Sequence, residues 1–232
     1  MPGTPVRVLL ARHGETVFNV EGRWQGQSDS PLTPRGLAQA RLLAEALSSE
    51  PIAAIYSSDL GRATQTAGEV ARPHRLPVRL DTRLREIDVG LWTGRSRAEI
   101  EAFDASGLRT WATAPASMRL PNGETIEEAQ QRALEFFTEC MPAHLDQTII
   151  VITHGAIGQA ILIHAMGRPP ADLWLRERLD NCQISRLEWT AEHGLHLLEL
   201  CDVRHLADVG SLRNWRTTDA DAAEPDPDVD VA

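Results

Sequence analysis

Short apolar runs alternate along this chain with longer amphipathic segments, and this alternation constrains its fold more than any other feature. The runs VRVLLA (6–11), IAAIYSS (52–58) and QTIIVITHG (147–155) have the length and composition of buried strands, and LPVRL (76–80) resembles a shorter one. Strands that are separated by helices pair in parallel through crossover connections. The pattern therefore predicts an α/β fold with helices on both faces of the sheet.

Helix signals follow several of these strands. Thr33, with a proline after it, is a candidate N-cap, and Ser58 or Asp59 is the candidate cap of the helix after the second long strand. A long amphipathic helix is predicted over 122–144 and an apolar helix over 156–167.

The remaining segments complete the predicted architecture. CQISRLEW (182–189) and LHLLELCD (195–202) indicate an antiparallel hairpin, which either pairs edge to edge in a homodimer or forms a covered sheet edge. Residues 95–120 are less regular, with a short helix over RSRAEIEAFD (95–104) and then irregular sequence around Trp111. We therefore expect a three-layer α/β/α sandwich with a mixed, mostly parallel sheet and a small helical and irregular cap insertion, in a single domain over residues 1–216.

Composition narrows the classes of function. The 232 residues contain no apolar run long enough to span a membrane, we expect no secretory leader, and three scattered cysteines suit a reducing cytoplasm. The net charge of -10 argues against nucleic acid as a partner. Residues 217–232 form an acidic tail that we expect to be disordered. All 23 basic residues are arginine, so every side-chain cation that can meet a phosphate is a forked guanidinium.

Two histidines stand directly after predicted strands. His13 follows the first strand and His154 follows the strand at 147–153, and each precedes a glycine, Gly14 and Gly155. Because ligands of open α/β sheets bind at the carboxyl ends of the strands, both imidazoles are expected at one site.

Two arginines accompany the histidines. Arg12 adjoins the first of them, and Arg62 falls in the first turn of the helix after 52–58. Guanidinium groups and helix N-terminal amides together suit a phosphoryl group. No metal-ligand spacing such as HExxH and no Walker-type loop is present in the sequence, so we expect no metal and no cofactor.

Seven blocks in a fixed order extend this pattern. They are RHGET (12–16), Asn19, RWQGQSDSPLTPRG (23–36), YSSDLGRATQTA (56–67), LREIDVGLWTG (84–94), NGET (122–125) and VITHG (151–155). Together these blocks resemble the histidine phosphatase superfamily, whose branches include cofactor-dependent phosphoglycerate mutases and many small-molecule phosphatases.

The resemblance implies a catalytic role for each matching residue. His13 is then the nucleophile that forms a phosphohistidine, and Glu86 is the proton donor to the leaving oxygen. Arg12, Arg62 and His154 hold the phosphoryl oxygens. Neighbouring arginines favour the neutral, nucleophilic form of an imidazole, and a hydrogen bond from its second nitrogen to a carbonyl fixes the tautomer.

The same resemblance implies a substrate-binding set around the phosphate. Asn19 and the Gln25–Gly26 segment line the phosphate pocket, and Gly155 allows close approach of the backbone. Gln25 stands where mutases often have Ser or Thr, which leaves the role of its side chain open.

The length of the cap favours one branch of the family. Only 68 positions separate Glu86 from His154, whereas mutases of the family carry a longer insertion with basic substrate contacts. The sequence therefore predicts a phosphomonoesterase for a small polar phosphorylated metabolite. A 2,3-bisphosphoglycerate-dependent mutase and a non-catalytic phosphate-binding module are the alternatives. Candidates for the roof of the site and for a second anionic group of the substrate are Trp92, Phe103, Trp111, Arg95, Arg97, Arg109 and Arg119.

Overall fold

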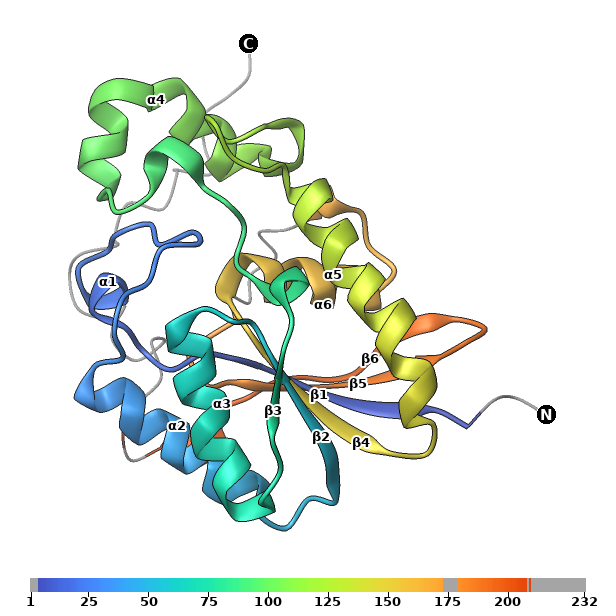
Figure 1. The fold of residues 1–232 in the computed structure, drawn as a ribbon. Helices are drawn as coiled ribbons and strands as arrows, with labels where there is room; N and C mark the ends of the chain where they lie inside the picture. The colour runs from blue at the N-terminus through green and yellow to red at the C-terminus, as the bar shows by residue number, and fades with distance from the viewer. Residues whose placement is uncertain (1–3, 173–178, 208, 210–232) are drawn as a thin grey trace.

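A six-stranded sheet with the order β3-β2-β4-β1-β5-β6 forms the middle layer of the protein (Figure 1). The computed structural model describes residues 4–172, 179–207 and 209, so the acidic tail predicted at 217–232 lies outside the described residues. The strands are β1 (Val6–Arg12), β2 (Ile52–Ser57), β3 (Val78–Leu80), β4 (Thr148–Thr153), β5 (Ile184–Thr190) and β6 (Gly194–Asp202).

Strand direction agrees with the sequence pattern. The pairs β1–β4, β4–β2 and β2–β3 are parallel, whereas β5 is antiparallel to both β1 and β6. The mixed, mostly parallel sheet and the terminal β5–β6 hairpin are therefore confirmed.

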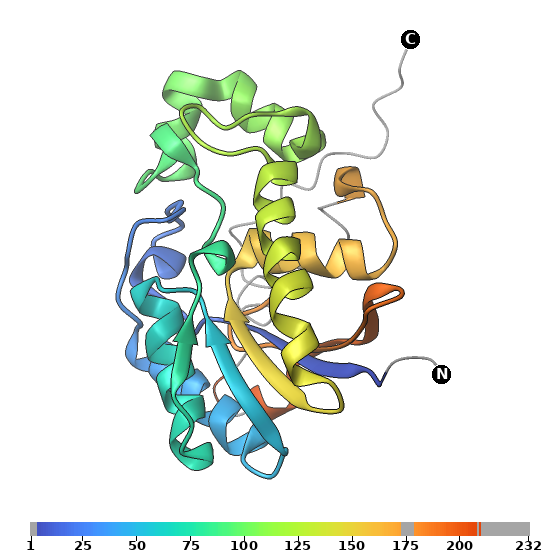
Figure 2. The same ribbon diagram turned by 45° about the vertical axis from the view of Figure 1, so that its right-hand side comes forward.

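Helices cover both faces of the sheet (Figures 1 and 2). In β1, Leu9 and Ala11 belong to the apolar core under α2 (Pro34–Leu47) and α3 (Gly61–His74). Their neighbours Val8 and Leu10 belong to the core under α5 (Ile126–Cys140) and α6 (Gly155–Ala165). Since successive side chains of a strand point to opposite faces, one apolar strand serves both layers, and the three-layer α/β/α sandwich is confirmed.

Two helix starts match local signals. The Thr33 hydroxyl accepts the Gly36 N–H at 2.9 Å at the start of α2, as predicted. Thr125 caps α5 in a capping box with Glu128, so this helix begins a few residues inside the predicted range of 122–144.

The predicted cap of α3 is wrong. Its N-cap is Leu60, which has no side-chain cap, and the first helical N–H, from Gly61, instead donates to the distant Asp29 carboxylate at 3.0 Å. Asp59 is unavailable for capping because its carboxylate is bound by Arg85 at 2.7 Å. The Ser58 hydroxyl accepts the Leu60 N–H at 3.3 Å, before the helix begins.

The segment expected to be irregular after a short helix is helical. The helix α4 spans Arg97–Thr113 with a kink at Asp104, whose backbone is non-helical, so Trp111 lies on a helix. The Asp104 carboxylate accepts the Gly107 N–H at 2.9 Å and the Trp92 indole N–H at 3.0 Å. Asp104 thus restarts the helix as an internal N-cap.

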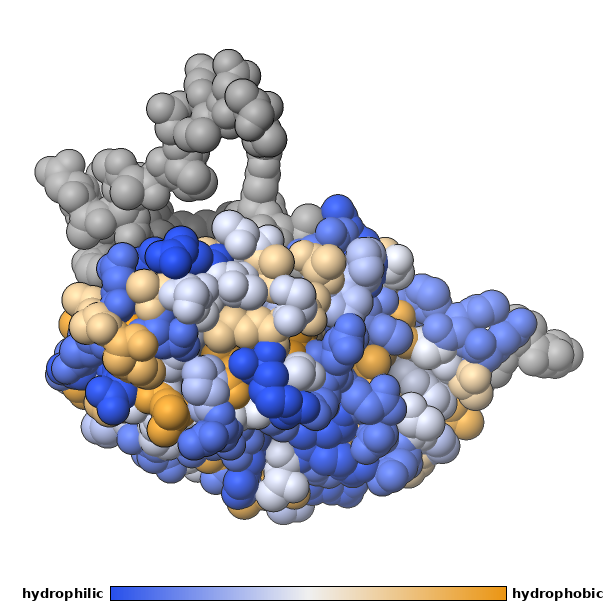
Figure 3. All heavy atoms as spheres, turned by 90° about the horizontal axis from the view of Figure 1, so that it is seen from above, coloured by the Kyte–Doolittle hydropathy of each residue, from blue (hydrophilic) through white to orange (hydrophobic). Residues whose placement is uncertain are grey.

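The helix α4 lies above the rest of the fold in Figure 1, and the face seen from above mixes strongly hydrophilic with hydrophobic residues (Figure 3). The short helix α1 (Val17–Val20) follows β1 and begins with a capping box between Thr16 and Asn19. Across the described ranges, no helix combines the length and the apolar character that crossing a lipid bilayer requires.

Candidate active site

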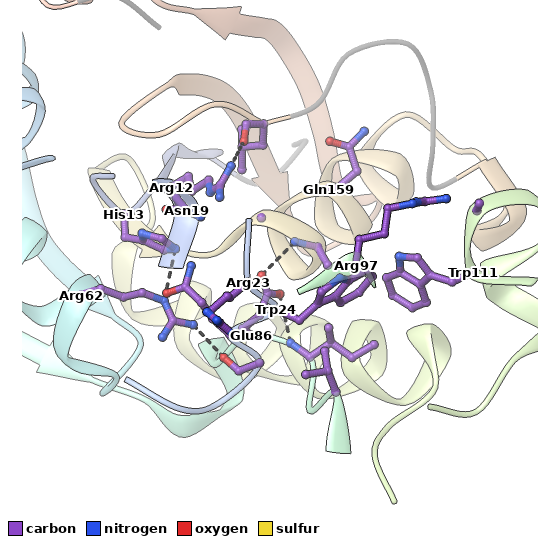
Figure 4. A pocket seen from close by; sticks show the side chains of 18 of the residues that line it. Arg12, His13, Asn19, Arg23, Trp24, Arg62, Glu86, Arg97, Trp111 and Gln159 are labelled. Atoms are coloured by element: carbon purple, nitrogen blue, oxygen red, sulfur yellow. Dashed lines mark hydrogen bonds between the residues drawn. The ribbon is translucent and has the colours of Figure 1, made fainter. Parts of the chain in front are cut away.

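A cavity of about 430 Å³ opens where β1 and β4 end. Its walls come from the residues after these strands, from the 23–26 loop, from the segment around Glu86 and from the second half of α4. In Figure 4, Arg12, His13 and Arg62 gather at one end of this cavity, and Arg97 and Trp111 lie at the other.

His13 is held rigidly at the end of β1. Its backbone N–H donates to the Thr153 carbonyl at 3.0 Å, and its backbone carbonyl accepts from Asn181 Nδ2 at 2.8 Å. The ring Nδ1 lies 2.7 Å from the Gly14 carbonyl. Because a carbonyl only accepts, Nδ1 carries the proton and Nε2 keeps its lone pair. This is the tautomer that a nucleophilic imidazole requires.

Arg62 connects the two histidines. Its Nε lies 3.2 Å from His13 Nε2 and 3.1 Å from His154 Nδ1, so both imidazoles share one N–H donor. The two terminal nitrogens donate to the Ser28 and Gly26 carbonyls at 2.7 and 2.8 Å. Burial lowers the pKa of Arg62 to about 10, which still leaves the guanidinium charged at neutral pH.

Both histidines are neutral in this environment. Burial, followed by the positive charge of Arg62, lowers the pKa of His13 and of His154 well below the ordinary value for histidine. Their ring centroids are 5.1 Å apart. The predicted convergence of residues 13 and 154 on Arg62 is therefore present in the fold, and the electrostatics keep the lone pair of His13 free of a proton.

His154 itself does not line the cavity. Its ring is fully buried, and its Nε2 has no hydrogen-bond partner among the residues that the structure describes. Because Nδ1 accepts from Arg62, Nε2 carries the ring proton and is a spare donor next to the site. Direct contact between His154 and phosphoryl oxygens stays a prediction.

The Glu86 carboxyl group lines the cavity at the N-terminus of α6. Its two oxygens accept the backbone N–H groups of Ile87 at 3.0 Å, Ile157 at 3.0 Å and Ala156 at 3.1 Å. A Cβ atom placed on Gly155 would lie 3.5 Å from the Arg12 guanidinium carbon and 3.6 Å from Glu86 Oε2. The missing side chain at Gly155 therefore leaves space between a cation and a carboxyl group.

The remaining predicted residues also line the cavity. Arg12 Nη1 donates to the Leu179 carbonyl at 2.8 Å. The side-chain oxygens of Asn19 and Gln25 accept from the Thr16 N–H and hydroxyl at 3.1 Å each, which directs their amide nitrogens away from this turn. Gly26 adopts a φ of +51°, and a Cβ there would lie 2.7 Å from Val89 Cγ2, so only glycine fits.

Arg23 and Trp24 are among the residues of the outer wall that were not predicted. Arg23 and Trp24 belong to the block that contains Gln25, but nothing in the sequence distinguishes them from packing residues. The Trp24 ring lies edge-on to Trp92 and Trp111, with centroids 4.9 and 5.4 Å away. This arrangement supplies an aromatic wall.

The candidates from the cap divide into two groups. Arg97 and Trp111 line the cavity, whereas Trp92 is buried behind Trp24. Phe103 is 49% exposed and lies under the guanidinium of Arg95 at 4.9 Å. Of the described lining residues, none is Phe103, Arg95, Arg109 or Arg119.

Comparison with known proteins identifies the family. Fold and site together define an α/β protein with a histidine and two arginines at the strand ends. Residues 8–202 match the family model described as "Histidine phosphatase superfamily (branch 1)". The chain belongs to the histidine phosphatase superfamily.

Individual relatives extend over most of both chains. "Probable phosphoglycerate mutase GpmB" of Proteus mirabilis is 37% identical over 209 residues, which is 88% of this chain and 96% of the relative. The solved structure of Bacillus stearothermophilus YhfR is 34% identical with a TM-score of 0.82, covering 87% of this chain and 99% of that one. A mycobacterial glucosyl-3-phosphoglycerate phosphatase is 30% identical with a TM-score of 0.76, covering 84% and 98%.

These comparisons confirm the resemblance drawn from the seven sequence blocks. They support a histidine phosphatase, a class of enzymes that hydrolyse phosphoric monoesters. The names of the relatives include both a mutase and a phosphatase, so they agree on the superfamily and differ in the reaction.

Proposed function

We propose that this protein is a phosphomonoesterase that acts on a small polar phosphorylated metabolite through a phosphohistidine at Nε2 of His13. The observation that carries the proposal is the state of His13. Its Nδ1 is bound to a carbonyl, its Nε2 is unprotonated, and it lines the same cavity as Glu86. Phosphoryl transfer depends mostly on such positioning and on stabilised charge.

The reaction divides into two displacements. In the first, His13 Nε2 attacks phosphorus, the bond from phosphorus to the ester oxygen breaks, and Glu86 gives its proton to that oxygen. In the second, Glu86 takes a proton from water, the water oxygen attacks phosphorus, and the bond between nitrogen and phosphorus breaks to release phosphate. After the two displacements Glu86 is protonated again and His13 Nε2 has its lone pair back, so the groups return to their starting state.

Arg62 is suited to the change at His13. When the Nε2 lone pair of His13 forms the bond to phosphorus, it no longer accepts the Arg62 N–H. This N–H is already shared with His154 Nδ1, so it retains an acceptor throughout. The attack therefore leaves no buried donor unsatisfied. A buried donor without an acceptor would cost about 1–3 kcal/mol.

The outer cavity suggests a substrate with a second anionic group. Arg23 is bound by Glu21 and Glu99, but Arg97 has no ion pair with any residue in the described parts of the chain. The names of two similar proteins contain phosphoglycerate, a phosphate ester that carries a carboxylate. We propose that Arg97 meets such a group, with Trp24 and Trp111 beside it.

The test of the proposed function measures phosphate release from a panel of monoesters. We expect turnover of 3-phosphoglycerate and of an aryl phosphate by the wild type and none by His13→Ala. Activity that survives His13→Ala rules out the phosphohistidine. The absence of turnover by the wild type across the panel favours the non-catalytic phosphate-binding module.

A mutase is the second candidate, because the curated relative carries that name. The same assay distinguishes it when 3-phosphoglycerate is incubated with and without 2,3-bisphosphoglycerate. Isomerisation to 2-phosphoglycerate that requires the bisphosphate, without release of phosphate, would favour the mutase. A phosphatase releases phosphate irrespective of the bisphosphate.

A further inference from the structure

The guanidinium of Arg132, on α5, lies against the segment that carries Glu86. Its Nη1 donates to the carbonyls of Arg83 at 2.7 Å and Arg85 at 2.8 Å, and its Nη2 donates to the carbonyl of Glu86 at 3.0 Å. One side chain thus binds the backbone at Glu86 and at two residues just before it. Arg132 does not line the cavity among the described lining residues, so it acts on the site only through its neighbours.

Glu124 completes this contact. Its Oε1 accepts Arg132 Nε at 2.8 Å, and its Oε2 accepts Arg132 Nη2 at 2.9 Å and the backbone N–H of Asp88 at 2.9 Å. All five N–H donors of Arg132 are therefore used, three on backbone carbonyls and two on Glu124. Burial alone would raise the pKa of Glu124, but these hydrogen bonds lower it by more. The net pKa is therefore lowered, and the pair is charged.

The segment from 85 to 89 needs such external partners because it forms neither helix nor strand. The carbonyl of Leu84 accepts from the Thr153 hydroxyl at 2.9 Å, and the carbonyl of Glu86 also accepts from Gln27 at 3.3 Å. At its other end Glu86 is fixed by the α6 amides. The backbone of Glu86 is therefore held by α5 and its carboxyl group by α6.

From this arrangement we infer that Arg132 and Glu124 are positioning residues that hold Glu86 for proton transfer to the leaving oxygen. The inference rests on the proposed role of Glu86 as the proton donor. A misplacement of about 1 Å can cost about a hundredfold in rate. Neither lysine, with three donors on one nitrogen, nor methionine, with none, can bind three carbonyls and a carboxylate at once.

A positioning role predicts a dependence on the leaving group. An alkyl phosphate needs its leaving oxygen protonated, whereas 4-nitrophenyl phosphate has a leaving group that departs with little help. Loss of a positioned proton donor therefore lowers kcat for the alkyl ester selectively. A defect that merely loosens the fold lowers both rates by the same factor.

The experiment compares kcat for glycerol 3-phosphate and 4-nitrophenyl phosphate in the full chain. We expect Glu86→Gln to lower the alkyl-to-aryl ratio about a hundredfold. Arg132→Met and Glu124→Gln should each lower it about tenfold or more, and Arg132→Lys should restore little of the loss. In the Glu86→Gln background, Arg132→Met should not change the ratio further, because the group that it positions is gone.

Arg83→Met is the matched control. The Arg83 side chain also lies beside α5, but it binds Asp81 and Glu139 and makes none of the contacts to Glu86. Its alkyl-to-aryl ratio should equal that of the wild type. Glu124→Gln keeps the size of the side chain. If Arg132→Met does not fold, the ratio of Glu124→Gln decides whether the pair positions Glu86.

The outcomes separate the inference from the function on which it rests. An unchanged ratio in folded Arg132→Met, or in Glu124→Gln, overturns the positioning role while Glu86→Gln remains selective. Equal losses on both esters in Glu86→Gln instead overturn the assignment of Glu86 as the proton donor. A further fall of the ratio in the double variant also overturns the inference, because Arg132 would then act independently of Glu86.

Discussion

Acidification should destabilise this protein before most of its carboxyl groups titrate. His13 and His154 are both buried and neutral, with pKa values well below the ordinary 6.5. The unfolded chain binds protons at these two residues as pH falls through 6.5, and the folded protein does not. The unfolded state therefore gains stability on the acid side, so this contribution to folding is complete above pH 6.5 and is lost below it.

The magnitude follows from the number of protons. Each proton that the unfolded state binds in excess changes the free energy of unfolding by about 1.4 kcal/mol per pH unit, so two histidines give about 2.7 kcal/mol per unit. Between pH 6.5, where the unfolded histidines are half protonated, and pH 5 the loss reaches about 3 kcal/mol if both rings stay neutral. Domains have about 5–15 kcal/mol of total stability, so the effect is large.

The assay is urea unfolding at several pH values between 7.5 and 5 in a buffer without phosphate. His13→Asn combined with His154→Asn is the comparison, because asparagine keeps a side-chain acceptor for Arg62 and does not titrate. We expect a much shallower dependence on pH in the double variant, with a remainder from His164 and His205, because burial also lowers the pKa of each. Equal slopes in the double variant and the wild type would refute the claim that the two rings are held neutral.

Three further substitutions test the geometry of the site and its cap. Gly155→Ala should leave the melting temperature unchanged, because the new methyl group meets only ordinary contacts at 3.5 Å, but should lower kcat/KM at least about tenfold by filling the phosphate space. Gly14→Ala should destabilise the fold by about 1–3 kcal/mol in urea unfolding, because its Cβ would lie 2.4 Å from the Gly36 carbonyl oxygen. Asp104→Ala should cost about 1–2 kcal/mol in the same assay, because it removes the cap of Gly107 and the partner of the Trp92 indole. A stable Gly14→Ala, a fully active Gly155→Ala or an unaltered Asp104→Ala would each contradict the corresponding contact.

Local patterns predicted the elements that local physics determines. The apolar runs gave β1 and β4, and Thr33 capped α2, because strand burial and N-capping depend on a few neighbouring residues. The prediction of the α3 cap was wrong because the actual partner of the first helical N–H is distant in the sequence. Asp29 is 32 residues away from the Gly61 N–H that it binds, and no local pattern carries that contact.

Helix α4 shows a limit of a different kind. The sequence pattern predicted that the regular helix ends near Asp104, and the backbone does leave the helical conformation at this residue. The same aspartate then caps the continuation, which presents Leu108, Trp111 and Ala112 to the cavity. An internal cap stops one helix and starts the next at a single residue, so the pattern alone does not distinguish a kink from an end.

The residues after the strands were predictable because parallel strands bring their carboxyl ends together. His13, Gly155 and Arg62 followed from this rule, and the resemblance added Glu86. Which arginine of the cap lines the cavity was not predictable, because the direction of a side chain depends on packing. Arg97 lines the cavity, and Arg95, two residues earlier, lies on Phe103.

The hydrogen bonds of Arg62 clarify how the site divides its tasks. Its guanidinium binds two backbone carbonyls and two imidazoles before any substrate arrives, so much of its donor capacity is already committed to the protein. A group held in this way contributes fixed charge at low cost in reorganisation, which is the form of electrostatic stabilisation that accelerates phosphoryl transfer. Burial is the main cause of the lowered pKa of His13 and of His154, and the charge of Arg62, whose Nε–H faces both rings, lowers both pKa values further. In the proposed mechanism, the charge that attracts the phosphoryl group therefore also helps to keep the nucleophile reactive, and removing it should impair binding and chemistry together.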